Sequence, residues 1–376
     1  MEPHQTANPK RQTAWLTLAL TPGLGNRSIL RLVKRFGSPE AALNASEKEL
    51  EAVAGLRGKA LAALARKETT IPPQKEWEAI QRQGFRLLCL DDPEYPANLA
   101  AIPDPPAILY ISGAPEPRDL VSVSVVGSRA ASPAGIVFTE GLCRDLAARG
   151  VVIVSGMAVG IDAAAHRGAV KAGGRTLGVL GCGLDVDYPR ANGELKKRIA
   201  ENGVLYSEFP LGTPPAPGHF PMRNRIISGL GLGVVVVEAA NKSGSLITAR
   251  LALEQGREVF AVPGQARSFR SVGTHQLLRE GAKLVETAED ILEEIRSLVR
   301  PSWAPESKAP APPETALTVT GEEAELLGAL DDSPQHIDEI CRSLEWPISR
   351  VSTILLALEL KGKARQLPGK YFSLLR

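Results

Sequence analysis

Short runs of β-branched and aliphatic residues alternate with amphipathic segments between residues 118 and 299. Helical spacing of apolar residues recurs at Ala134–Ala148, Asp162–Ala172 and Leu246–Gln255. Strands that are apolar throughout and separated by helices predict a parallel sheet covered on both faces. We therefore expect residues 118–299 to form an α/β, Rossmann-like core. Six runs have the length and composition of its buried strands: Val121–Val126, Val151–Val154, Thr176–Leu180, Val204–Ser207, Gly233–Glu238 and Glu258–Val262.

Residues 1–71 contain two similar segments, Leu20–Val33 and Val53–Arg66. Each has a glycine turn followed by apolar residues at helical spacing. The pattern resembles a pair of helix-hairpin-helix (SAM-like) units, whose turn amides can contact a DNA backbone. A small helical bundle, in which the glycines only make tight turns, fits it equally well. The sequence therefore predicts a helical N-terminal domain and leaves its role open.

Seven prolines lie between Pro93 and Pro117, within residues 72–117. Proline removes a backbone donor and clashes with the preceding turn, so this density excludes regular helix. We expect residues 72–117 to form a proline-rich extended strap that leads into the core.

The C-terminal part of the chain divides in two. Residues 300–316 are rich in proline and alanine and predict a linker. Residues 317–376 predict a winged-helix domain, with three helices followed by a hairpin. This last segment carries seven Lys/Arg against nine Asp/Glu. A negative balance disfavours contact with a polyanion, so a protein-binding or regulatory role is at least as well supported as DNA reading.

Composition narrows the class of protein. Hydrophobic residues make up 44% of the chain, enough for a packed core, whereas aromatic residues make up only 5%, so base stacking must be confined to a few positions. The four cysteines are far apart and form no CxxC pair, which disfavours a metal site or a disulfide framework. No apolar run is long enough to span a membrane, and the N-terminus lacks a signal-peptide core. We expect a soluble, cytoplasmic protein.

Turns rich in glycine and serine follow three of the expected strands, at Val125–Arg129, Val154–Asp162 and Asn241–Ala249. The carboxyl ends of parallel strands meet at one edge of a sheet, and ligands bind there. Backbone amides at helix starts favour anions, as do nearby Arg and Lys side chains. The stretch Phe220–Arg225, FPMRNR, adds further cations, which we place at another strand end. These features predict a track for phosphates along the sheet edge, without a residue set for breaking bonds.

Two arginines of this track have a competing interpretation as structural ion pairs. Arg129 follows a Gly-Ser turn and can hold a phosphate through two hydrogen bonds, which we favour over a pair with Glu208 or Glu238. For Arg225 the two interpretations are evenly balanced, because a buried Arg–Glu pair is common beside a strand end.

Asp162 and His166 lie four residues apart and share one helix face. With Ser155 they have the residue types of a hydrolytic triad, but no GxSxG nucleophile turn is present. We expect Asp162 to cap the helix and His166 to pack in the core or contact DNA.

Several longer strings occur in a characteristic order and spacing, and together they resemble the DNA processing protein A (DprA/Smf) family. The resemblance covers almost the whole chain, although the N-terminal and winged-helix parts carry it less specifically. The strings are YPANL (95–99), DPPAILYISG (104–113), VVGSR (125–129), VSGMAVGIDAAAH (154–166), LGCGLDVDYPRAN (180–192), SEFPLGTPP (207–215), FPMRNRIISGL (220–230) and VVEAANKSGSLITA (236–249).

The sequence carries no metal-ligand cluster, no Walker-type GxxxxGK(S/T) turn and no activated nucleophile, so we expect no enzymatic activity and no cofactor. The resemblance implies binding to single-stranded DNA, loading of the recombinase RecA onto that DNA, and protection of DNA taken up in natural transformation. It also implies a homodimer, for which His275, Leu277 and Leu278 are candidate interface residues. Packing of their helix onto its own sheet would bury the same two leucines and is nearly as well supported. The candidate DNA-binding residues, from the motifs and the phosphate argument together, are Gly127, Ser128, Arg129, Ser155, Gly156, His166, Lys171, Arg190, Arg223, Asn224, Arg225, Lys242, Ser243, Gly244 and Ser245.

Two other functions remain open at this point. Rossmann-like folds also occur in nucleotide-processing enzymes, but those we compare carry a PGGxGT phosphate turn where this chain has NKSGSLITA. A transcription regulator would use the winged helix to bind DNA and the core as a ligand sensor, and the acidic balance of residues 317–376 disfavours it.

Overall fold

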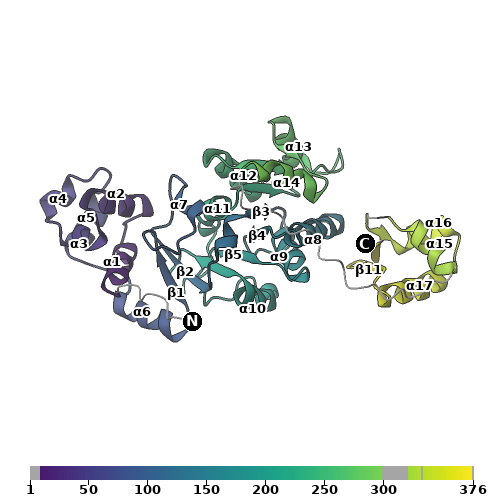
Figure 1. Ribbon diagram of the computed structural model, residues 1–376, viewed down its shortest axis with the longest axis horizontal. Helices are drawn as coiled ribbons and strands as arrows, with labels where there is room; N and C mark the ends of the chain where they lie inside the picture. The colour runs from purple at the N-terminus through teal and green to yellow at the C-terminus, as the bar shows by residue number, and fades with distance from the viewer. Residues whose placement is uncertain (1–8, 299–320, 332, 375–376) are drawn as a thin grey trace.

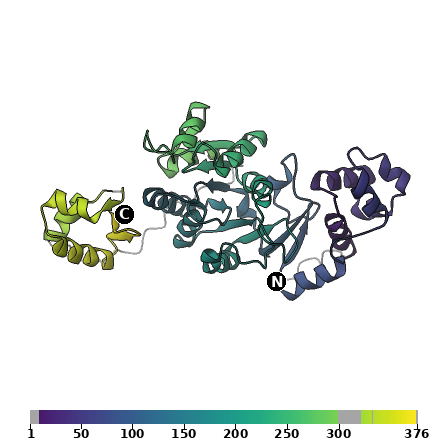
Figure 2. The same cartoon turned by 180° about the vertical axis from the view of Figure 1, so that it is seen from behind.

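A nine-stranded sheet forms the centre of the molecule, with a helical domain at one end and a small winged helix at the other (Figure 1). This computed structural model describes residues 9–298, 321–331 and 333–374. The view from behind shows the same arrangement, with the N-terminal helices and the C-terminal domain on opposite sides of the core (Figure 2). Within the described ranges, no helix combines the length and apolar character needed to cross a membrane. The proposed linker at residues 300–316 lies outside the described residues.

The sheet has the strand order β1-β2-β6-β5-β4-β3-β7-β8-β9. All neighbours from β6 to β9 are parallel, whereas β1 and β2 join as an antiparallel pair at the β6 edge. This confirms the expected Rossmann-like core. The strands are β1 (Arg86–Cys89), β2 (Ile108–Gly113), β3 (Ser122–Val126), β4 (Val152–Ser155), β5 (Thr176–Leu180), β6 (Val204–Ser207), β7 (Gly233–Val236), β8 (Glu258–Ala261) and β9 (Lys283–Leu284).

The direction in which strands are added to the sheet reverses between β6 and β7. From β3 the chain adds β4, β5 and β6 in one direction, and then returns to add β7, β8 and β9 on the other side of β3. This reversal creates a topological switch point between β3 and β7, where the loops leaving the two strands diverge. Crevices that bind ligands in open α/β sheets form at such points.

Helices cover both faces of the sheet, because successive strand residues point to opposite faces. Val123 and Val125 pack with the α8, α9 and α14 side, whereas Val126 packs with the α11 and α12 side. The helices of the core are α7 (Ala97–Ala100), α8 (Pro133–Ala147), α9 (Ile161–Lys171), α10 (Gly193–Asn202), α11 (His219–Leu230), α12 (Gly244–Glu254), α13 (Val272–Arg279) and α14 (Ala288–Arg296), with short 3₁₀ turns η1 (Pro117–Leu120) and η2 (Arg190–Asn192).

The expectation of an extended strap at residues 72–117 was wrong in its main feature. This segment begins with α6 (Pro73–Arg82) and contributes β1 and β2 to the sheet. The prolines lie after β1 and after β2, where they do not interrupt the ladder, and the apolar stretches between them form the strands. The sheet therefore starts before residue 118.

The N-terminal domain consists of short helices that share a hydrophobic cluster with the sheet edge. Trp15 and Leu32 belong to the same cluster as Leu87 and Tyr110 of the antiparallel strands. The glycine turns predicted from the repeated pattern separate α1 from α2 and α4 from α5, and Gly23 and Gly55 adopt φ of 77° and 84°. The helices are α1 (Pro9–Leu20), α2 (Asn26–Phe36), α3 (Pro39–Asn44), α4 (Glu47–Glu51) and α5 (Gly58–Ala65).

The C-terminal domain has its own core and the three helices and hairpin expected from the sequence. Its strands form a separate sheet in the order β10-β12-β11. Arg365 of the hairpin makes an ion pair with Glu140 of α8, at 2.7 Å. The elements are α15 (Gly321–Ala329), β10 (Gln335–His336), α16 (Ile337–Leu344), α17 (Ile348–Leu360), β11 (Ala364–Leu367) and β12 (Tyr371–Leu374).

Candidate nucleic-acid interface

A groove of about 730 Å³ lies at the switch point between β3 and β7. The loop after β3 forms one side, the turn from β7 to α12 forms the other, and the first turns of α11 face both. A smaller pocket of about 40 Å³ adjoins it at the ends of β4 and β5, and Arg129, Phe220 and Arg223 line both spaces. Both spaces lie at the carboxyl edge of the sheet, where the sequence predicts a ligand site.

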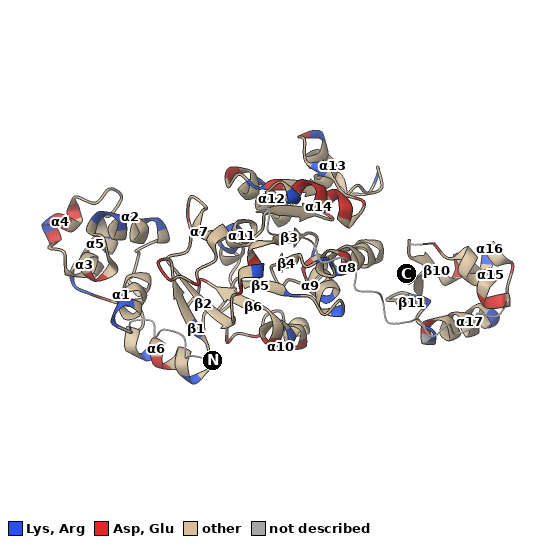
Figure 3. Cartoon of the chain, viewed as in Figure 1, with Lys and Arg blue, Asp and Glu red and all other residues tan. Residues whose placement is uncertain are grey.

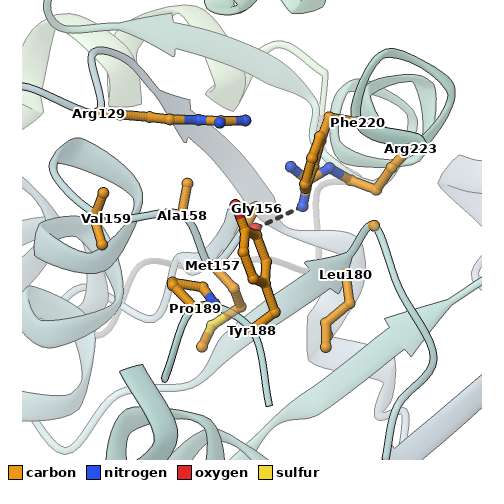
Figure 4. A pocket seen from close by; sticks show the side chains of 11 residues that line it. Arg129, Gly156, Met157, Ala158, Val159, Leu180, Tyr188, Pro189, Phe220 and Arg223 are labelled. Carbon is orange, nitrogen blue, oxygen red and sulfur yellow. Dashed lines mark hydrogen bonds between the residues drawn. The ribbon is translucent and has the colours of Figure 1, made fainter. Parts of the chain in front are cut away.

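Arg129 is exposed at the junction of the groove and the small pocket. It forms no ion pair with any residue that the structure describes. Its guanidinium carbon lies 4.9 Å from the centre of the Phe220 ring, in a cation–π arrangement (Figure 4). An exposed, uncompensated arginine held by an aromatic ring keeps its hydrogen-bond donors free for an anion.

Phe220 provides a flat apolar surface beside these donors, and the sequence interpretation did not include it among the site residues. The Tyr188 ring lies 5.8 Å away at an angle of 36°. Gly181 leaves room for the ring, because a Cβ there would lie 2.9 Å from a Phe220 ring carbon. The sequence did contain a signal for Phe220, because it lies beside the arginines of FPMRNR, and aromatic rings next to basic residues are typical of single-strand binding sites.

Arg223 is the buried cation of the site. FPMRNR forms the first turns of α11 and not a strand end, so the expected placement of this stretch was wrong. The Arg223 guanidinium donates to the carbonyl oxygen of Gly156 at the end of β4 (Figure 4). It also donates to the carbonyl oxygen of Val179 in β5. Burial lowers the pKa of Arg223 to about 10, which leaves the side chain positively charged near neutral pH.

Asp162 is the acidic residue among those lining the groove. Burial raises the pKa of this carboxyl, and the neighbouring Arg223 and Arg129 charges oppose that effect. The carboxylate accepts a hydrogen bond from the Ala158 amide at 3.3 Å, in the loop before α9. The N-cap of α9 is Gly160 and has no side-chain cap, so the expectation that Asp162 caps the helix was wrong; Asp162 lies within its first turn. With Arg129, Arg223 and Lys242 on the lining, the groove has a positive balance.

The turn between β7 and α12 forms the far side of the groove. Lys242 is exposed and makes no ion pair with the described residues. Ser243 caps α12, its hydroxyl oxygen accepting from the Ser245 amide at 3.3 Å. The Asn224 side chain of α11 donates to the Gly244 carbonyl at 3.4 Å. These contacts hold the turn and leave the Lys242 ammonium available to a ligand.

Packing requires two of the candidate site glycines, Gly127 and Gly156, whereas a Cβ on Gly244 would meet no atom within 4 Å. A Cβ on Gly127 would lie 2.7 Å from the Ile161 side chain, and one on Gly156 would lie 2.7 Å from the Asp162 carboxylate. At Gly156 the carbonyl, and not the amide, faces the buried arginine. Ser128 lines the groove and its hydroxyl accepts from the Ala130 amide at 3.2 Å.

Three of the candidate residues are placed away from the groove. The Ser155 hydroxyl is buried and donates to the Val125 carbonyl. His166 is fully buried with its Nδ1 2.7 Å from the Thr176 hydroxyl, and burial lowers its pKa to about 3, so the ring is neutral near pH 7. Lys171 lies at the end of α9, at the opposite edge of the sheet, and pairs with a carboxylate. We therefore correct the expectation that these side chains contact DNA.

Glu140 is the carboxylate that holds Lys171. Burial raises its pKa, but hydrogen bonds from Arg365, Lys171 and Arg167 outweigh that effect and lower the pKa to about 2. This cluster joins α8, α9 and the C-terminal domain. It accounts for Arg167, Lys171 and Arg365 as structural partners. Figure 3 shows the Lys and Arg positions of α9 in blue.

For Arg225 the sequence left phosphate binding and a structural ion pair evenly balanced, and the structure shows the ion pair. The Arg225 guanidinium donates to both Glu208 oxygens, one of them at 2.7 Å, and lies 3.5 Å from Asp104. Glu238 pairs with neither arginine and accepts hydrogen bonds from the Ser132 amide and hydroxyl. Arg190 is exposed in η2, outside the groove lining.

The candidate interface residues His275, Leu277 and Leu278 all belong to α13. Leu277 is buried and Leu278 partly buried, and both pack against the hydrophobic cluster of their own sheet. The His275 ring nitrogen Nε2 lies 3.0 Å from the Gly264 carbonyl oxygen. Intramolecular packing accounts for these contacts, so α13 by itself gives no sign of a partner.

Comparisons with known proteins agree with this architecture. A model of the DNA recombination-mediator protein A family matches residues 86–296, and a model of the DprA winged helix domain matches residues 307–370. Protein Smf from Escherichia coli (strain K12) is 41% identical over 314 residues, which cover 81% of this chain and 82% of that protein.

Two solved structures are also similar. The X-ray structure of DNA processing protein A from Streptococcus pneumoniae has a TM-score of 0.67 at 37% identity, covering 77% of this chain and 99% of that one. A structure of DNA processing protein A from Helicobacter pylori, which concerns its single-stranded DNA binding mode, has a TM-score of 0.51 at 31% identity, covering 57% of this chain and 97% of that one. These matches confirm the resemblance seen in the motifs, and the chain belongs to the DNA recombination-mediator protein A (DprA/Smf) family.

Proposed function

We propose that this protein binds single-stranded DNA in the groove between β3 and β7. The observation that carries the proposal is the combination of an aromatic ring, Phe220, with three cations, Arg129, Arg223 and Lys242, at the switch point of the sheet. Cations along a groove bind the backbone without reading sequence, and an aromatic ring stacks on any base. The Helicobacter pylori neighbour, studied for its single-stranded DNA binding mode, supports the same assignment.

The described contacts support a role without catalysis. Ser155, Asp162 and His166 have the residue types of a triad, but the Ser155 hydroxyl bonds to a backbone carbonyl and the His166 ring bonds to Thr176. A nucleophile needs a base within hydrogen-bond reach, and these partners direct the two groups elsewhere. We therefore expect no nuclease, glycosidase or nucleotide-hydrolysing activity.

From the family we further propose that the protein loads RecA onto single-stranded DNA and protects incoming DNA during natural transformation, in the cytoplasm, as a homodimer. The edge strand β9 supports self-association, because its Leu284 side chain is 48% exposed beside α13. An uncovered strand edge with an apolar residue is a ready surface for a second chain. Leu284→Glu should give a folded monomer by sedimentation, whereas a folded variant that still dimerises would place the interface elsewhere.

Binding of three labelled probes tests the proposed function. Oligo-dT should bind more tightly than a duplex of the same length, and a mononucleotide should bind weakly because it offers one base and few phosphates. Preference for the mononucleotide, or its steady turnover, would move the protein to the nucleotide-processing class. Preference for the duplex would instead favour a regulator that reads DNA through the winged helix.

A further inference from the structure

A second aromatic–arginine pair lies at the same edge of the sheet, outside the groove. It belongs to the loop between β8 and α13, where Phe269 is 65% exposed and the Arg270 guanidinium carbon lies 4.6 Å from the centre of its ring. Arg267 of this loop is also exposed and forms no ion pair with the described residues. The loop residues 264–271, GQARSFRS, contain two arginines and no acidic residue.

This pair repeats the arrangement at the groove. There, Arg129 lies over the Phe220 ring at 4.9 Å, close to the 4.6 Å of the second pair. A single exposed hydrophobic residue is common on protein surfaces and needs no special explanation. Phe269 differs because it is the most exposed of the large hydrophobic side chains in the described residues, and because an arginine covers its ring.

Hydrogen bonds fix the second pair relative to the first. Arg270 Nε donates to the Ala130 carbonyl at 3.0 Å, one residue after Arg129, and the Arg270 carbonyl accepts from the Ala239 amide at 2.7 Å. Phe269 is thereby connected to the ends of both β3 and β7. The loop stands out from the core near α13 (Figure 1).

The strand order places the two pairs in line. Along the carboxyl edge, the small pocket lies at the ends of β5 and β4, the groove at β3 and β7, and the Phe269 loop at β8. Neighbouring strands lie about 4.8 Å apart, so the end of β8 lies roughly 10 Å from the end of β3. A strand of DNA that crosses the groove from β5 toward β7 meets the β8 loop next.

We propose that Phe269 and Arg270 form a second base-stacking platform that extends the single-stranded DNA track beyond the groove, with Arg267 as a phosphate contact. The inference rests on the proposed function and adds the direction and extent of the bound strand. Every base has a flat face that stacks on an aromatic ring, so the platform works without sequence preference. A surface for a second copy of the chain is the competing use of this loop.

A length series of labelled oligo-dT tests the platform. The series covers lengths of about 4 to 16 nucleotides. We expect Phe269→Ala to leave the affinity for the shortest oligonucleotides that bind unchanged and to weaken binding of the longer ones by roughly 5- to 150-fold. Phe269→Trp should restore the affinity. Phe220→Ala, by contrast, should weaken binding at every length. Leu120→Ala, which removes a 43% exposed side chain before β3 at the opposite edge, is the matched control and should have no effect.

A stacking reporter separates DNA contact from self-association. The fluorescence of 2-aminopurine, placed at either end of a long oligonucleotide in turn, should be quenched by the wild type at one end and lose that quenching in Phe269→Ala. Equal loss of affinity at all lengths, or no loss at any length, would overturn the platform. A fall in affinity that accompanies conversion of dimer to monomer in sedimentation would assign Phe269 to an interface instead. Wild-type protein that binds no oligo-dT would overturn the proposed function itself.

Discussion

Arg129 and Arg225 lie near the groove but differ in their partners, so together they make a matched comparison. Arg129 is exposed, lies over the Phe220 ring and makes no ion pair within the described residues, whereas the Arg225 side chain is 12% exposed and pairs with Glu208 and Asp104. Replacing each by glutamine removes one positive charge from the same region. The structure predicts opposite consequences for binding and for stability.

The magnitudes follow from these contacts. Arg129→Gln loses a cation–π contact worth about 0.5–1 kcal/mol at an exposed site, so the melting temperature should change little. If its guanidinium holds a phosphate, the lost charged hydrogen bonds are worth about 1.5–3 kcal/mol, or roughly 10- to 150-fold in affinity for oligo-dT. Arg225→Gln leaves the largely buried Glu208 carboxylate without its cation, whereas Asp104 keeps Arg27 and Asn26 as partners. The loss should cost about 3–5 kcal/mol of unfolding free energy and lower the melting temperature by roughly 6–20 °C.

The assay is titration of labelled oligo-dT at several salt concentrations, beside thermal unfolding of the same samples. Arg129→Gln should reduce the steepness of the log–log salt dependence by about 0.7, the share of one phosphate contact on a single strand. Arg225→Gln should keep the wild-type slope at temperatures where it is folded. Unchanged affinity in a folded Arg129→Gln variant, or a collapse of its melting temperature, would refute the assignment.

Three further predictions concern the surroundings of the site. Below a pH of about 6.5 the unfolded state binds a proton at His166, whereas the buried side chain, with its pKa of about 3, stays neutral. As the pH falls from about 6.5 toward 3, this residue should therefore lower the free energy of unfolding by about 1.4 kcal/mol per pH unit. Denaturant titrations of His166→Asn should lack that contribution. The stabilisation from Glu140, whose pKa is about 2, is present above the unfolded pKa of about 4.3, so the stability difference between the wild type and Glu140→Gln should shrink as the pH falls below that value. Gly181→Ala should displace the Phe220 ring and weaken oligo-dT binding without loss of the fold by circular dichroism, and unaltered binding would show that the ring position is unimportant.

The parallel core was predictable because its strands are continuous apolar runs between helical patterns. The expected bounds of β5 and β6 agree with the structure at both ends. The antiparallel pair β1 and β2 was missed because the prolines around it, which exclude regular helix, led us to expect an extended strap outside the sheet. Proline excludes pairing only where its own nitrogen should donate, and the short stretches between prolines remain free to form strands.

The glycine turns predicted where the groove lies, but not which partners each side chain has. Arg225, Lys171 and His166 are held by Glu208, Glu140 and Thr176, residues that neither motif nor spacing connects to them. Only the fold brings these pairs together. The sequence could name the cations near the sheet edge, whereas deciding which of them are free required the contacts.

The salt dependence of wild-type binding to oligo-dT tests the central claim most directly. The two exposed cations on the groove lining, Arg129 and Lys242, predict a log–log slope of about −1.4 from counterion release on a single strand, with further contacts making it steeper. The account predicts tight binding at low salt that weakens along this slope, and weaker binding of a duplex. Affinity for oligo-dT that stays constant from low to high salt would contradict it.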